Sequence, residues 1–158
     1  MGITPNFDFE SIHKYLSDFQ KRIVLAQIES LKYLGELCVT RARSIPKSIG
    51  FEDQTGNLRS SIGYVVFVDG IAVSSDFKGI LSGSEGVKEG IGLAYKVGSE
   101  NSKGLVLVVV AGMNYALAVE SRGRDVLTST EHFAIQELPR MLNDLRVNIN
   151  NLWNSLMI

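Results

Sequence analysis

The stretch FEDQTGNLRSSIGYVVFVDG, residues 51–70, predicts a short helix that runs directly into a β-hairpin. Asp53 or Thr55 supplies the side-chain oxygen that a helix N-cap needs, and the helix is expected to continue through Ile62. Gly63 then ends it, because glycine readily adopts the left-handed conformation that terminates helices. The stretch carries no cluster of catalytic side chains.

The hairpin itself follows from composition. Residues 64–68 (YVVFV) are β-branched or aromatic, as is typical of a strand. The next pair, Asp69-Gly70, is a strong signal for a two-residue turn, so residues 71–75 are expected to return as a second strand.

A long amphipathic helix is predicted upstream, over residues 8–45, because apolar side chains recur there at steps of three and four. Pro46 ends it. A helix of this length reaches roughly 50 Å at 1.5 Å per residue, whereas a compact domain of this size has a radius of gyration of about 15 Å. Either Gly35 breaks the helix, or its overhang packs on something else.

The glycine-rich segment at residues 77–92 is interpreted as a flexible loop, which could become ordered on docking. Residues 93–98 and 105–112, separated by a polar turn, predict a second hairpin. The sheet region, residues 55–120, is therefore expected to hold about four strands in two hairpins.

A second long helix is expected over residues 128–157, opened by a capping box of Thr128 with Glu131 and interrupted or restarted at Pro139. The chain finishes on the apolar pair Met157-Ile158, four residues after its only tryptophan, Trp153. This end either packs on its own core or anchors in a partner, as buried aromatic side chains often do.

These elements predict a single α+β domain, residues 1–158, with a mainly antiparallel sheet and helices on one face. The strands at 64–68 and 105–110 are apolar on both faces, and such strands are usually covered on both sides. Two helical segments are too few to cover both faces of a four-stranded sheet, so a neighbouring subunit is expected to cover the rest.

Composition and charge argue against several classes of function. The chain of 158 residues has a formal net charge of −1, which argues against a general nucleic-acid binder. A single cysteine, Cys38, excludes an internal disulfide and a cysteine-based zinc site. The first residues lack the pattern of a signal peptide, and the apolar run at residues 105–111 is too short to span a bilayer.

No catalytic, cofactor-binding or metal-ligating set emerges from the sequence. The histidines His13 and His132 are isolated, and no metal-ligand spacing, nucleophile elbow or phosphate-binding loop is present. Glu120 and Asp125 flank the run SRGR, where acid–base chemistry is conceivable, but a solvated turn with local ion pairs is favoured.

A modest basic group surrounds the end of the first helix. Its members are Arg41, Arg43, Lys47 and Arg59. In one interpretation their charges complement the dipole at the C-terminus of the helix. In the other they dock to an acidic partner surface or to DNA passing close by.

Two segments resemble landmarks of a known family. TGNLRSSIGYVV resembles the TG-x-LR-x-SI segment that leads into a strand in the tail-completion proteins of long-tailed bacteriophages. GMNYALAVESRGRDVLTSTEHFA resembles the second landmark of that family, a YA-x-x-VE-x-G segment before the last helix. Order and spacing agree over roughly residues 8–145. Where many members follow VE with an aromatic residue, glycine and threonine, this chain has Ser121-Arg122-Gly123.

The resemblance is to neck proteins of lambda-like siphophages, also known as head–tail joining or minor capsid proteins. It implies a structural virion protein, without catalysis or cofactor, that forms a homo-oligomeric ring, a hexamer or dodecamer. The ring would sit at the head–tail junction, between the head connector or adaptor proteins and the tail tube or tail terminator proteins. Assembly would take place in the cytoplasm of the bacterial host, with genome DNA passing through the lumen without sequence-specific contact.

Seven residues are interface candidates. Four positions follow from the resemblance, two arginines lie beside them, and one is the aromatic anchor: Arg59, Tyr64, Tyr115, Glu120, Arg122, Arg124 and Trp153. Two alternatives stay open at this point. One is a small ligand-binding or enzymatic α+β domain, which needs convergent polar groups in a pocket. The other is a DNA-binding accessory protein, against which the charge balance argues.

Overall fold

The computed structural model describes residues 8–101 and 103–156 of the chain. The last residues of the expected helix over 128–157, with the apolar end Met157-Ile158, lie outside that part. The elements follow in the order α1 (Phe9–Arg43), α2 (Asn57–Ser60), β1 (Ile62–Val68), β2 (Ile71–Asp76), α3 (Ser84–Ser99), β3 (Leu105–Ala111), α4 (Ala116–Glu120) and α5 (Thr128–Leu156). The fold is therefore α+β, as the sequence predicts.

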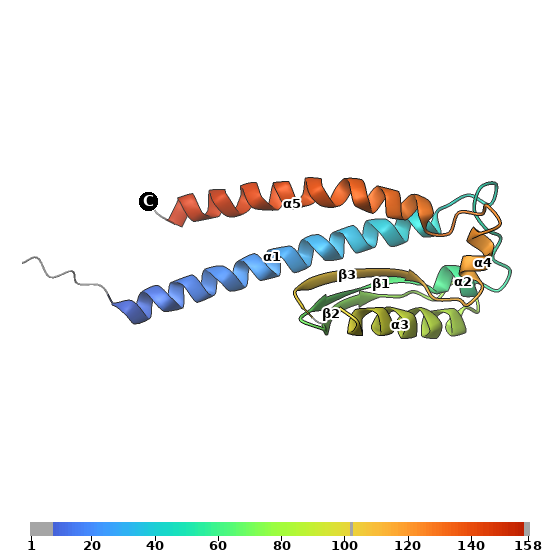
Figure 1. Ribbon diagram of the computed structural model, residues 1–158, viewed down its shortest axis with the longest axis horizontal. Helices are drawn as coiled ribbons and strands as arrows, with labels where there is room; N and C mark the ends of the chain where they lie inside the picture. The colour runs from blue at the N-terminus through green and yellow to red at the C-terminus, as the bar shows by residue number, and fades with distance from the viewer. Residues whose placement is uncertain (1–7, 102, 157–158) are drawn as a thin grey trace, which may run out of the picture.

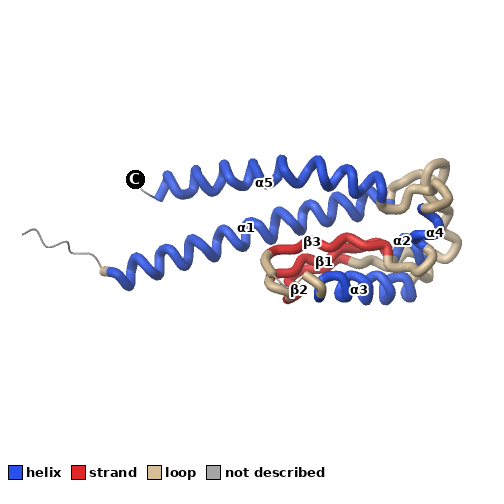
Figure 2. The backbone as a smooth tube through the Cα atoms, viewed as in Figure 1, coloured by secondary structure: helices blue, strands red, loops and turns tan. Residues whose placement is uncertain are grey.

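The elements form layers, with α5 on α1, α1 on the sheet, and α3 on the opposite face of the sheet (Figure 1). The two long helices run side by side and extend far beyond the sheet at one end, whereas α2 and α4 gather at the other end (Figure 2). The described residues form a three-stranded antiparallel sheet in the order β2-β1-β3, so the expectation of about four strands is wrong by one.

The central strand β1 supplies two cores. Its residues Ile62, Tyr64 and Val66 pack with Val39 and Ala42 of α1. The alternate residues of β1 belong to a second cluster on the α3 side of the sheet, where Val65 and Phe67 pack with Ala94, Val108 and Val110. The strand is thus buried on both faces, because successive side chains of a strand point in opposite directions. Helices of the same chain cover both faces, which corrects the expectation of helices on one face only.

Helix α3 corrects two further expectations: residues 84–92 of the expected flexible loop (77–92) are helical, and so are residues 93–98, where a strand was expected. Residues 77–83 form no helix or strand, as expected of a loop. Small residues recur along this helix at steps of four, and all four are buried: Gly86, Gly90, Ala94 and Gly98. A side chain at Gly90 or Gly98 would collide with the sheet side, where the aromatic rings of Phe77 and Phe67 lie. The glycines therefore allow close helix–sheet approach, and their helix cost of about 1 kcal/mol each is offset by packing.

The hairpin prediction is confirmed, with β1 and β2 joined at Asp69 and Gly70. Both turn residues have positive φ angles, 48° and 79°, as a tight two-residue turn requires. The short helix α2 is also present, but it ends at Ser60 and β1 begins at Ile62, so Gly63 lies in the strand rather than at the helix end. The carboxylate of Asp53 accepts hydrogen bonds from the backbone N–H groups of Gly56 at 2.9 Å and Arg59 at 2.7 Å.

The two long helices are continuous. Gly35 does not break α1, because it is the point where the helix packs on the ring of Tyr64; a Cβ there would lie 2.6 Å from that ring. The overhang of α1 instead runs beside α5 (Figure 1). Helix α5 likewise continues through Pro139, which contradicts the expected interruption there.

Candidate functional site

The two segments that carry the family resemblance meet at one end of the sheet. Ser61, which is fully buried, accepts a hydrogen bond from the N–H of Gly112 at its carbonyl, 3.1 Å away. Its hydroxyl accepts another from the N–H of Met113 at 3.3 Å and donates to the carbonyl of Leu58 at 2.8 Å. The serine therefore joins the end of α2 to the segment that follows β3, and we call this region the motif junction.

Arg59 of the motif junction is engaged within the chain. Its guanidinium donates to the backbone carbonyls of Arg43 and, at 3.4 Å, of Ile45. It also lies 5.0 Å from the centroid of the Phe51 ring, a cation–π contact. Arg59 thus holds the end of α1 against α2, which leaves little of its hydrogen-bonding capacity for a partner.

Tyr64 contradicts its expected place at an interface. Only 2% of its surface is exposed, and its ring lies against Gly35 in the core beneath α1. Burial raises the pKa of its phenol above the ordinary value. The second position after the TG-x-LR-x-SI segment is therefore a core position, and its aromatic side chain serves packing within the chain.

Glu120 caps the last helix. One carboxylate oxygen accepts hydrogen bonds from the N–H of Leu127 at 3.0 Å, the N–H of Thr128 at 2.8 Å and the hydroxyl of Thr128 at 2.7 Å. Partial burial by itself raises the pKa of Glu120, but these hydrogen bonds outweigh it and hold the pKa below its ordinary value. The predicted capping box of Thr128 with Glu131 is wrong, because the N–H and the hydroxyl of Thr128 donate hydrogen bonds to Glu120 instead.

Asp125 caps the same helix, since its carboxylate accepts from the N–H of Ser129 at 3.2 Å. Both carboxylates that flank the SRGR run are thus occupied at the beginning of α5. Within the described residues Arg122 and Arg124 form no ion pair with them. Arg124 instead donates to the carbonyls of Lys47 and Ser48, at 3.4 and 3.2 Å. The expected local ion pairs in this turn are therefore replaced by helix caps and backbone contacts.

Tyr115, Arg122 and Arg124 remain at the surface near the motif junction. Tyr115 is 39% exposed, and partial burial together with the nearby carboxylates of Asp53 and Glu85 raises the pKa of its phenol. Of the seven interface candidates, these three present accessible side chains close to the sequence landmarks.

The basic group around the end of α1 does not form one patch. Arg43 donates to the carbonyls of Ile62 at 2.6 Å and Lys78 at 3.2 Å. Arg41 lies over the ring of Phe133, and Lys47 pairs with a glutamate at 2.9 Å. These side chains have separate structural roles within the chain.

Trp153 packs on its own chain at the far end of the two long helices. Its ring centroid is 5.0 Å from that of Phe19, with the ring planes tilted by 58°. The tryptophan is still 37% exposed. Trp153 therefore contacts Phe19 of its own chain but belongs to neither core cluster, and anchoring of this end in a partner stays a prediction.

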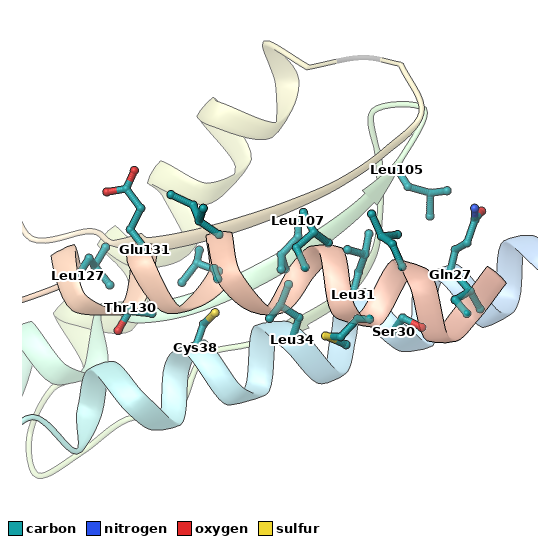
Figure 3. Close-up of a pocket in the computed structure, with 17 residues that line it drawn as sticks. Gln27, Ser30, Leu31, Leu34, Cys38, Leu105, Leu107, Leu127, Thr130 and Glu131 are labelled. Carbon is teal, nitrogen blue, oxygen red and sulfur yellow. The ribbon is translucent and has the colours of Figure 1, made fainter. Parts of the chain in front are cut away.

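An apolar groove of about 660 Å³ lies between α1, α5 and β3, and we call it the α1–α5 groove (Figure 3). Leu31 and Leu34 of α1, Leu107 of β3, and Leu138 and Leu142 of α5 are among its walls. The groove exists because α5 packs on α1 without closing onto the sheet (Figure 1). Sequence reasoning missed it, although the apolar stripe along residues 134–145 of α5 is visible in the sequence.

Polar groups are few in the α1–α5 groove. Leu127, Cys38 and Thr130 lie toward one end, and Gln27 and Leu105 toward the other (Figure 3). The hydroxyl of Thr130, which is 2% exposed, has no hydrogen-bond partner among the described residues. The thiol of Cys38 is fully buried, and this burial raises its pKa. Such a lining suits an apolar occupant and offers no arrangement for acid–base or nucleophilic chemistry.

Neither a metal site nor a membrane-spanning helix is found in the described residues, 8–101 and 103–156. In that part of the chain no three histidine, cysteine, aspartate or glutamate side chains gather into a group that could hold a metal ion. No helix described there combines the length and the apolar character needed to cross a membrane. Comparison with known proteins finds no family model, curated protein or solved structure that matches this chain.

Proposed function

We propose that this chain is a structural subunit of a bacteriophage neck, which assembles into a ring between the head connector and the tail tube. In this role it completes the tail end of the head–tail junction. The ring bridges two assemblies by protein contacts, holds no cofactor and catalyses no reaction.

The observation that carries the proposal is the motif junction. The two segments that resemble the family landmarks are separated by more than forty residues in the sequence, yet they are joined through Ser61 in the structure. Glu120 of the second landmark also caps the first turn of α5, and Arg59 of the first landmark donates a hydrogen bond to the last residue of α1. The landmark residues therefore have a shared physical task, which is to hold the two long helices on the sheet. A resemblance by chance gives no reason for such convergence.

A second observation agrees with a subunit that works in an assembly. The overhang of α1 and the α1–α5 groove both leave large apolar side chains exposed, among them Leu16 at 46% and Ile135 at 62%. Extended apolar surface of this kind marks interaction sites in soluble proteins.

The experiment is direct. The purified full chain is weighed by native mass measurement, alone and after mixing with purified connector rings or tail tubes, and the particles are imaged by electron microscopy. We expect a closed ring or stoichiometric capping of one end of either partner. A chain that ignores both partners at all concentrations refutes the proposal.

One observation favours a second candidate, a domain that binds an apolar small molecule. The α1–α5 groove has a volume within the range of about 300–1,000 Å³ that is common for ligand pockets. Native mass spectrometry of the protein purified from cells, without added ligand, tests this candidate, since a bound molecule adds a fixed mass that denaturation removes.

A further inference from the structure

The overhang of α1 carries an apolar surface of its own. Its large exposed side chains, which we call the overhang patch, are Phe9 (69% exposed), Ile12 (44%), Tyr15 (47%) and Leu16 (46%). Ile12 and Leu16 continue the stripe of α1 that contacts α5 further along, because steps of three and four residues keep side chains on one helix face. Helices α1 and α5 diverge toward this end of the molecule (Figure 1), and Ile12, Tyr15 and Leu16 are each nearly half exposed.

The α1–α5 groove is a matching recess. Its open rim on α5, which we call the groove rim, consists of Ile135 (62% exposed), Leu138 (36%) and Leu142 (50%). On α1 the groove lining runs from Gln27 to Cys38, about 17 Å along the helix axis, and the overhang patch spans roughly 11 Å. The patch is therefore short enough to lie along the groove.

The same chain cannot bring these two surfaces together. Leu16 and Gln27 lie on one continuous helix, separated by roughly 16 Å along its axis. No proline or glycine between them allows the sharp kink that a return would need. The overhang patch of one copy can therefore reach only the groove of another copy.

We infer that the overhang patch of one copy docks in the α1–α5 groove of a second copy, head to tail. This inference rests on the proposed function, since it names the contact between neighbouring subunits of the ring. A head-to-tail contact uses two different surfaces, so every copy keeps one free patch and one free groove until the ring closes.

The size of the contact agrees with a ring. At roughly 150–200 Å² for a whole large side chain, the exposed parts of the seven residues offer about 650 Å² of apolar surface. Because apolar area makes up a little over half of such interfaces, the whole contact buries about 1,100 Å². This lies just below the range of stable pairwise complexes, about 1,200–2,000 Å². One contact is weak, whereas ring closure gives each copy two.

Two double variants test the overhang patch and the groove rim separately. The overhang variant carries Ile12→Asp and Leu16→Asp, and the groove variant carries Ile135→Asp and Leu142→Asp. All four side chains are well exposed, so the fold tolerates the changes. The matched control carries Leu25→Asp and Val147→Asp, which are 60% and 46% exposed and lie on the opposite sides of the same two helices.

Mass photometry and sedimentation velocity are run on the full chain up to about millimolar concentration. We expect the wild type and the control to assemble, and each variant alone to need at least a roughly hundredfold higher concentration. An equimolar mixture of the two variants should form a heterodimer and nothing larger, because one intact patch meets one intact groove.

Three results overturn the inference: assembly of either variant at the wild-type concentration, a mixture that stays monomeric, or a wild type that never assembles. Failure of the proposed function looks different. If the variants behave as expected but wild-type rings ignore connectors and tail tubes, the contact stands and the neck role falls. If both variants still cap tail tubes as rings, the neck role stands and the contact falls.

Discussion

Replacing Glu120 by alanine should destabilise the folded chain, because the carboxylate of Glu120 caps the N-terminus of α5. The substitution removes an acceptor of three hydrogen bonds from Leu127 and Thr128, with distances of 2.7–3.0 Å. Loss of a helix cap typically costs about 0.5–2 kcal/mol, and hydrogen bonds to a charged group lie at the upper end. Since the side chain is only partly buried, we expect a loss of about 2 kcal/mol in the free energy of unfolding.

The matched control is Glu131→Ala. Among the described residues Glu131 accepts no hydrogen bond, and it only adds a favourable charge to the first turn of α5, which is worth about 0.5 kcal/mol. The capping box expected from the sequence predicts the reverse order. Urea unfolding, followed by far-UV circular dichroism at a concentration where the protein is monomeric, measures both. At a slope of about 2 kcal/mol per molar, Glu120→Ala should lower the midpoint by about 1 M.

A pH series sharpens the test with Glu120→Gln. The hydrogen bonds hold the pKa of the folded carboxyl below its ordinary value of 4.5, so the ionised form is the one that stabilises the fold. This contribution is present above that ordinary pKa and is lost as the pH falls through the folded pKa. The stability difference between wild type and Glu120→Gln should therefore shrink below about pH 4.5. The reasoning is refuted if Glu131→Ala costs as much as Glu120→Ala, or if the difference grows in acid.

Three further predictions concern the packing of α1. Gly35→Ala should cost about 1–3 kcal/mol in urea unfolding, because the new methyl group would overlap the ring of Tyr64, 2.6 Å away; unchanged stability would mean that the ring moves freely. Arg59→Met should lower the free energy of unfolding by about 2 kcal/mol in the same assay, because it removes two hydrogen bonds to backbone carbonyls and the contact with Phe51. An unchanged stability would mean that Arg59 is not needed within the chain and is available to contact a partner. Cys38, buried and with its pKa raised, should react with a thiol reagent only on unfolding; rapid labelling of the native chain would show that the α1–α5 groove opens.

Prediction from sequence works well for α1 and for the hairpin. The apolar stripe of α1 and the Asp69-Gly70 turn are local signals, because a periodicity or a positive-φ pair acts on the residues that carry it. The structure confirms both nearly to the residue. Runs of β-branched residues also indicate β1 and β3, whereas β2 is expected only as the strand that returns after the turn.

Helix α3 shows why the rest was missed. Its glycines count against a helix when each residue is weighed by its own propensity, and they indicate a loop. Their spacing, with Gly86, Gly90, Ala94 and Gly98 four apart, is a signal for a helix with one smooth face, but only a sheet placed against that face explains it. The fourth strand disappeared for the same reason, since residues 93–98 belong to this helix.

The candidate sites were also predictable only in part. The sequence identifies Tyr64 and Glu120 as landmark positions but does not reveal their roles, because burial under α1 and a hydrogen bond across a turn depend on tertiary structure. The α1–α5 groove was not predicted at all, since it is formed by three elements distant in the sequence.

The sequence by itself determined the long helices, the hairpin and the two-sided apolar strands, because these depend on contacts within a few residues. The tertiary structure alone decided which helix covers which face of the sheet (Figure 1). It also decided which carboxylate caps the N-terminus of α5 and where apolar surface stays uncovered. The physical reason is that burial and hydrogen bonding depend on which distant segments meet. Helices α1 and α5 diverge at one end, which leaves the overhang patch exposed, and α5 does not close onto the sheet, which leaves the groove rim exposed.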